Sequence, residues 1–166
     1  MFHKIVSNID HDRIKPLILD YIDTVESSVQ DITKTDWEDC YNSERPYIRE
    51  LFPLIERELR PLFRNMGADI IEVDNFWFQQ YKINDHHGWH THAHTHFSNI
   101  YYLELPDPSL VTEFIDPDTG EVLQPAVKEG DLLIVPSFIA HRSPVITTTD
   151  RKTVIVINMT IHSNRP

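Results

Sequence analysis

The chain is poor in several features that define common protein classes. Cysteine occurs once in 166 residues, at Cys40, which excludes an internal disulfide and any metal site built from several cysteines. No stretch approaches the roughly 18 uninterrupted apolar residues that a membrane-spanning helix needs, so we expect no membrane partner. The first ten residues contain no apolar signal core. We therefore expect the protein to be retained in the cytoplasm.

Basic residues are scarce relative to acidic ones. The chain has 15 Lys and Arg against 26 Asp and Glu, a formal net charge of −11, and its basic residues are scattered along the sequence. A surface with this charge repels phosphate backbones. We therefore expect no nucleic-acid partner, whereas a small-molecule or peptidyl substrate is compatible with the composition, and so is a homo-oligomer.

The length and the residue pattern predict one domain of mixed structure. No internal repeat or linker divides residues 1–166, and this length suits a single core. Residues 1–67 are predicted to be helical, with two amphipathic helices, the second of which Pro53 and Pro61 should break or kink. Residues 68–166 contain short β-branched and aromatic runs that are typical of strands. This order predicts an α+β domain whose helices pack on one side of an antiparallel sandwich or barrel.

Histidine is the residue type present in excess. Six of the ten histidines fall between residues 86 and 96, and from His90 to His96 they occupy every second position. In an extended chain, residues i and i+2 project on one face about 6.6 Å apart, so two such imidazoles can converge on one metal ion. His141 is the candidate third ligand of a facial site, because it follows a turn and a buried strand that would return it across a barrel. A solvated histidine-rich loop that collects metal without catalysis is the alternative.

The order and spacing of these residues resemble the Fe(II)/2-oxoglutarate-dependent oxygenases, in particular short phage-type members. The resembling segments are Trp89-His90-Thr91-His92 and Ser98-Asn99-Ile100-Tyr101-Tyr102-Leu103, and the distal histidine follows 49 positions after the pair. The resemblance covers about residues 76–160. It implies a double-stranded β-helix core of the jelly-roll or cupin-like type, in which His90, His92 and His141 hold catalytic Fe(II), with 2-oxoglutarate as co-substrate and O2 as oxidant.

The same resemblance implies residues that bind 2-oxoglutarate. Arg151 stands ten positions after the distal histidine, and Arg151-Lys152-Thr153 looks like the family's Arg-x-Ser/Thr pair. By this resemblance Arg151 would hold the distal carboxylate in a charge-assisted contact, and Thr153 would add a hydroxyl. Tyr102 resembles a tyrosine that helps to hold the same carboxylate, and Tyr81 resembles one that lines the active site.

One departure from the family pattern keeps alternatives open. The wider family usually has Asp or Glu where this chain has His92, and three-histidine iron sites also resemble cupin-type dioxygenases that need no 2-oxo acid. The leading hypothesis is a dioxygenase that hydroxylates a small-molecule or amino-acid/peptidyl substrate and releases succinate and CO2. The alternatives are a cupin-like dioxygenase or isomerase without 2-oxoglutarate, and a non-catalytic metal-binding protein. Within the run, His92 is preferred over His94 and His96 as the second ligand, because it matches the family segment.

Overall fold

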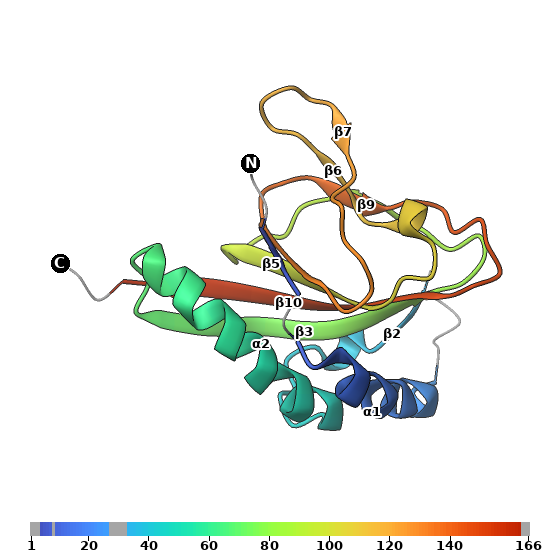
Figure 1. The fold of residues 1–166 in the computed structure, drawn as a ribbon, viewed down its shortest axis with the longest axis horizontal. Helices are drawn as coiled ribbons and strands as arrows, with labels where there is room; N and C mark the ends of the chain where they lie inside the picture. The colour runs from blue at the N-terminus through green and yellow to red at the C-terminus, as the bar shows by residue number, and fades with distance from the viewer. Residues whose placement is uncertain (1–3, 8, 27–32, 164–166) are drawn as a thin grey trace.

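Two antiparallel sheets face each other, and helices cover the outer side of the larger one (Figure 1). The computed structural model describes residues 4–7, 9–26 and 33–163. The larger sheet has the order β1-β8-β5-β10-β3-β2, and the smaller has the order β4-β9-β6-β7. The strands of the larger sheet are β1 (Lys4–Val6), β2 (Lys34–Thr35), β3 (Ile70–Tyr81), β5 (Phe97–Glu104), β8 (Leu132–Pro136) and β10 (Lys152–His162). Those of the smaller sheet are β4 (His87–His90), β6 (Glu113–Ile115), β7 (Val122–Leu123) and β9 (His141–Ser143).

Helices α1 (His11–Thr24) and α2 (Pro46–Asn65) lie side by side under the larger sheet (Figure 1). Pro53 and Pro61 do not break α2, contrary to our prediction. Their rings lie on its exposed side, while its opposite side is held by packing, which supplies most helical stability in a folded protein. The buried side chains on that side are Tyr47, Ile48, Leu51, Ile55, Leu59 and Phe63. Two short 3-10 helices, η1 (Trp37–Asp39) and η2 (Pro108–Leu110), complete the described elements.

The larger sheet separates two apolar cores, because successive side chains of a strand point to opposite faces. On β10, Ile155 and Ile157 belong to the core between this sheet and the helices. Val154 and Val156 belong to the core between the two sheets. This assignment of faces decides which side chains of β10 can reach a site inside the two-sheet body.

The predicted α+β architecture, with helices on one side of an antiparallel two-sheet core, is confirmed. The first 67 residues are less uniformly helical than we predicted, because β1 pairs with β8 and β2 pairs with β3. Both short strands extend the edges of the larger sheet. None of the described helices is long and apolar enough to cross a membrane.

Candidate metal centre

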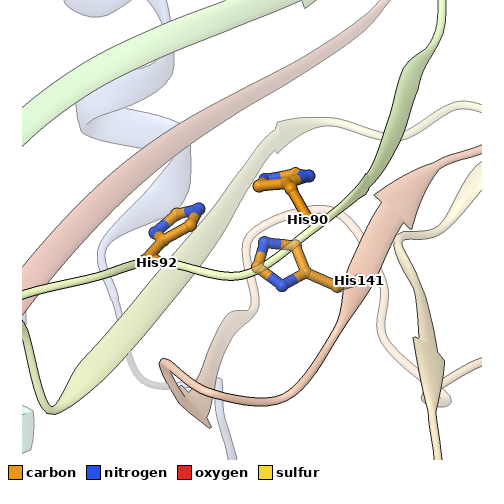
Figure 2. A group of neighbouring side chains, drawn as sticks. All are labelled: His90, His92 and His141. Carbon is orange, nitrogen blue, oxygen red and sulfur yellow. The ribbon is translucent and has the colours of Figure 1, made fainter.

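Three predicted ligands meet at one end of the smaller sheet. His90 is the last residue of β4 and His141 is the first of β9, and the two are paired across the antiparallel ladder. His92 lies two residues beyond β4, where its backbone N–H donates to the oxygen of Ser137 at 3.0 Å. The three side chains bring ligand atoms within 4.8 Å of one another. Their rings face a common space (Figure 2).

Hydrogen bonds orient all three imidazoles in the same way. In each ring Nδ1 contacts an oxygen that serves as acceptor, so Nδ1 carries the proton and Nε2 keeps its lone pair free for a metal. This arrangement is the one that metal-binding histidines usually have, with the second nitrogen held by a carbonyl or carboxylate. The acceptors are the oxygen of Gly88 for His90 at 2.8 Å, the side-chain oxygen of Asn158 for His92 at 2.7 Å, and the oxygen of Ile139 for His141 at 3.0 Å.

The surroundings keep two of these imidazoles neutral. Burial, with the neighbouring ring of His90, lowers the pKa of His141 to about 3. Burial also lowers the pKa of His92, against the opposing effect of its hydrogen bond to Asn158. Since a metal binds only the unprotonated ring, both histidines are ready for a metal ion at neutral pH. The donor set and its orientation therefore fit a divalent metal such as Fe(II).

A buried cation lies inside the same two-sheet body. Lys152 is fully buried, its Nζ donates to the Ser143 hydroxyl at 3.0 Å, and it lies 5.3 Å from the centre of the Tyr81 ring. Burial lowers the pKa of Lys152 to about 7, against the opposing effect of Glu113. No carboxylate of the described residues lies within ion-pair distance of this ammonium. An anion brought to it would therefore offset a large desolvation cost.

A small cavity joins the histidines to the partners of Lys152. Its volume is about 20 Å³, and it is lined by all three histidines, by Tyr81 and Ser143, and by His87. A cavity of this size accommodates about one water molecule, so a larger ligand has to displace side chains at its edge. His87 lies at this edge: its ring stacks on His90 with 4.1 Å between centroids, and it lines both this cavity and a second, wider cavity, called the outer groove below.

The structure places Arg151 and Thr153 against Glu104 and not at the histidines, and their contacts with 2-oxoglutarate remain predictions. Arg151 donates to both side-chain oxygens of Glu104 at 2.8–3.1 Å and lies 4.0 Å from Asp23 of α1. The Thr153 hydroxyl also donates to Glu104, at 2.5 Å. Both side chains therefore lie on the helix side of the larger sheet, with a carboxylate of the chain already bound to them.

The two predicted tyrosines lie inside the two-sheet body. Tyr81 lines the small cavity, and its hydroxyl donates to the side-chain oxygen of Gln79 at 2.6 Å. The Tyr102 hydroxyl accepts from the backbone N–H of Thr112 at 3.3 Å. Burial raises the pKa of each phenol, so both hydroxyls stay protonated. Their proposed contacts with a co-substrate remain predictions.

The other histidines of the run lie outside the group of three. His94 lines the outer groove in a left-handed backbone conformation with φ of 60°, and His96 accepts a hydrogen bond at Nδ1 from the backbone N–H of Ile161. Sequence reasoning missed Lys152 and Asn158. The sequence carries no signal for Lys152, because the strand that it begins shows no alternation of polar and apolar residues.

Comparison with known proteins places the fold. No protein-family model and no curated protein matches the sequence, but solved structures do. A viral collagen prolyl hydroxylase, vCPH of Paramecium Bursaria Chlorella virus-1, determined as a 2OG complex, has a TM-score of 0.68 at 11% identity and covers 96% of this chain and 95% of its own. The chain has the fold of the 2OG-Fe(II) oxygenases.

Two other solved structures support this assignment. A 2OG-Fe(II) oxygenase family oxidoreductase from Burkholderia pseudomallei has a TM-score of 0.73 at 12% identity, covering 98% of this chain and 87% of its own. AviO1 from Streptomyces viridochromogenes has a TM-score of 0.72 at 14% identity, covering 99% and 92%. Coverage of almost the whole chain means that the helical part belongs to the 2OG-Fe(II) oxygenase fold as well. The double-stranded β-helix predicted from the sequence is therefore confirmed.

Proposed function

We propose that this protein is an Fe(II)- and 2-oxoglutarate-dependent dioxygenase that hydroxylates a small-molecule or peptidyl substrate. The observation that carries the proposal is the combination of three histidines with free Nε2 atoms and a buried lysine ammonium whose partners, Tyr81 and Ser143, line the same cavity. The 2OG-Fe(II) oxygenase fold supports it. When bound, Fe(II) activates O2 while 2-oxoglutarate is converted to succinate and CO2.

Five residues of the site have a defined part in this proposal. His90, His92 and His141 hold the metal and leave positions open on it. Lys152, in place of Arg151 and Thr153, attracts the distal carboxylate of 2-oxoglutarate, and Ser143 keeps its ammonium in place. Binding of the dianion has two consequences: it restores the full positive charge of this lysine and it enlarges the small cavity.

Lys152 also distinguishes this proposal from the cupin-like alternative. A dioxygenase or isomerase without a 2-oxo acid needs the three histidines but has no use for a buried ammonium beside them. Burying an unpaired ammonium costs folding free energy. This cost is understandable if an anionic co-substrate binds there during the reaction.

The test is an anaerobic titration with Fe(II) followed by 2-oxoglutarate. We expect one Fe(II) and one 2-oxoglutarate per chain and the weak visible charge-transfer band of the chelate. On admission of O2, succinate should form. Binding of iron without any binding of 2-oxoglutarate would favour the cupin-like alternative, and binding of both without succinate formation would leave a metal-binding module.

A further inference from the structure

A wide groove lies over the metal centre, and aromatic and acidic side chains contribute to its lining. Its volume is about 860 Å³, and His90 and His92 form part of its floor. Two carboxylates, Glu72 and Asp74, line it, and no Lys or Arg does so among the described residues. The charge that Asp, Glu, Lys and Arg side chains bring to the lining of this groove is therefore negative.

Aromatic side chains form one wall of this groove. Trp37 lies edge-on to Trp77, with ring centroids 4.6 Å apart, and Tyr41 stands next to them in the lining. Trp37 and Tyr41 are 48% and 78% exposed, so their faces are available to a ligand. Exposed indole and phenol faces attract cations as well as apolar groups.

The aromatic wall is held in place by a buried polar network. Asp36, next to Trp37, pairs with Arg45, accepts from the Tyr47 hydroxyl at 2.9 Å and accepts from the backbone N–H of Phe78 at 2.8 Å. This network fixes the segment that carries Trp37 to β3. The wall is thus a preformed surface, which lowers the conformational cost of binding.

We propose that this groove selects substrates bearing a guanidinium or ammonium group, which contacts the Trp37 face and is neutralised by Glu72 and Asp74. The inference rests on the proposed function, because it names the substrate class of that same site. The π faces and the carboxylates of the lining both complement a positively charged donor. Glu72 and Asp74 make only weak interactions within the protein. Glu72 contacts His162 at 3.1 Å, and Asp74 accepts from the Thr160 hydroxyl at 2.9 Å.

The test compares two probes that differ only in charge. Nα-acetyl-arginine methylamide carries a guanidinium, and Nα-acetyl-citrulline methylamide carries a neutral ureido group of nearly the same shape. Each is titrated by calorimetry into the full chain, first alone and then with Fe(II) and 2-oxoglutarate under anaerobic conditions. A second pair, blocked heptapeptides with central arginine or citrulline, distinguishes a peptide side chain from a small molecule as the source of the cation. We expect tighter binding of the cationic member of at least one pair.

Variants identify the surface responsible. Removing both charges with Glu72→Gln and Asp74→Asn should weaken binding of the cationic probe about threefold to tenfold, as expected for partly exposed charge pairs. Trp37→Leu should weaken it by a similar factor of about three to ten. The matched control is Glu121→Gln, an exposed carboxylate outside the groove, which should change nothing.

Two outcomes would overturn the proposal: equal affinity for the charged and neutral probes, or an equal loss of affinity in the control and the groove variants. Melting temperatures of all variants show whether each is folded. Failure of the proposed function is seen separately, as absence of the charge-transfer band. Charge selectivity in the chain without metal would support the groove inference even then.

Discussion

A single hydrogen bond at Nδ1 decides what each histidine of the run can do. His90 and His92 have this atom bound to an acceptor and keep Nε2 free, as His141 does. His96 is different, because its Nδ1 accepts from the backbone N–H of Ile161. That contact requires the proton on Nε2, so the ring of His96 has no free lone pair in this conformation.

The first prediction concerns these ligands. We expect His90→Ala, His92→Ala and His141→Ala each to lower Fe(II) affinity by at least about 100-fold, more than the loss of a supporting residue usually costs. His94→Ala and His96→Ala should bind iron as the wild type does. Anaerobic metal titration measures this.

Replacing His92 with an acidic ligand tests the same site in a second way. His92→Asp should restore Fe(II) binding relative to His92→Ala, because it rebuilds a site of two histidines and one carboxylate. Retention of iron in His92→Ala together with its loss in His94→Ala or His96→Ala would show that the ligand pair lies further along the run.

At the scale of the element, β10 carries residues of both the candidate metal centre and the proposed 2-oxoglutarate site. Its inward face carries Lys152 at one end and Asn158, the partner of His92, towards the other, with Val154 and Val156 between them. Its outward face carries Thr153, preceded by Arg151 and bound with it to Glu104. The two faces of one strand therefore separate the residues that we propose to serve the site from those that bind Glu104.

The second prediction follows from this separation. Lys152→Met should weaken 2-oxoglutarate binding by about 2–4 kcal/mol, because one partner of a buried charge pair is removed, while Arg151→Gln should leave it nearly unchanged. Affinity in the wild type should also depend on pH. The pKa of Lys152 is about 7 and only the charged form attracts the dianion, so affinity should fall as the pH rises above 7, by at most about tenfold per pH unit.

Calorimetry of the iron-loaded protein between pH 7 and pH 9 measures this dependence. Lys152→Met is its internal control, since without the titrating ammonium its weaker affinity should stay flat over the same range. A loss of 2-oxoglutarate affinity in Arg151→Gln with none in Lys152→Met would show that Arg151, on the helix side of β10, binds the carboxylate of 2-oxoglutarate.

At the scale of the whole molecule, the metal centre joins the two sheets. His90 and His141 belong to the smaller sheet, while His92 is held by Asn158 of the larger one. Only the folded chain presents the three nitrogens together, because His141 is 49 residues from His92 in sequence. Metal binding is therefore coupled to folding.

The third prediction is that Fe(II) raises the melting temperature under anaerobic conditions. A ligand at 100 times its Kd stabilises the folded state by about 2.7 kcal/mol, which for a chain of this length corresponds to roughly 5–10 °C. Chelator should reverse the shift, and His141→Ala should abolish it. Equal shifts in the wild type and His141→Ala would mean that the metal acts elsewhere on the protein.

The sequence by itself determined the fold class and the histidine centre. Strand runs after residue 67 and alternate histidines are local patterns, and they need only the period of a β-strand to be interpreted. The turn and buried strand before His141 then indicated the third ligand, and the resemblance to the oxygenases agreed with it. The two prolines led us to predict a break or kink in α2, but the helix runs through both. Its stability depends on its packed face, which is a property of the assembled protein.

Only the tertiary structure decided that Lys152 points between the two sheets. From Lys152 to Met159 every residue of β10 is buried, so the strand shows no alternation of polar and apolar residues that would tell its two faces apart. An irregular stretch separates β9 from β10. Because of this stretch, the number of residues from His141 does not show which way a side chain of β10 points. Pairing of β10 between β3 and β5 sets that direction, turning Lys152 inward to Ser143 and Tyr81 and Arg151 outward to Glu104.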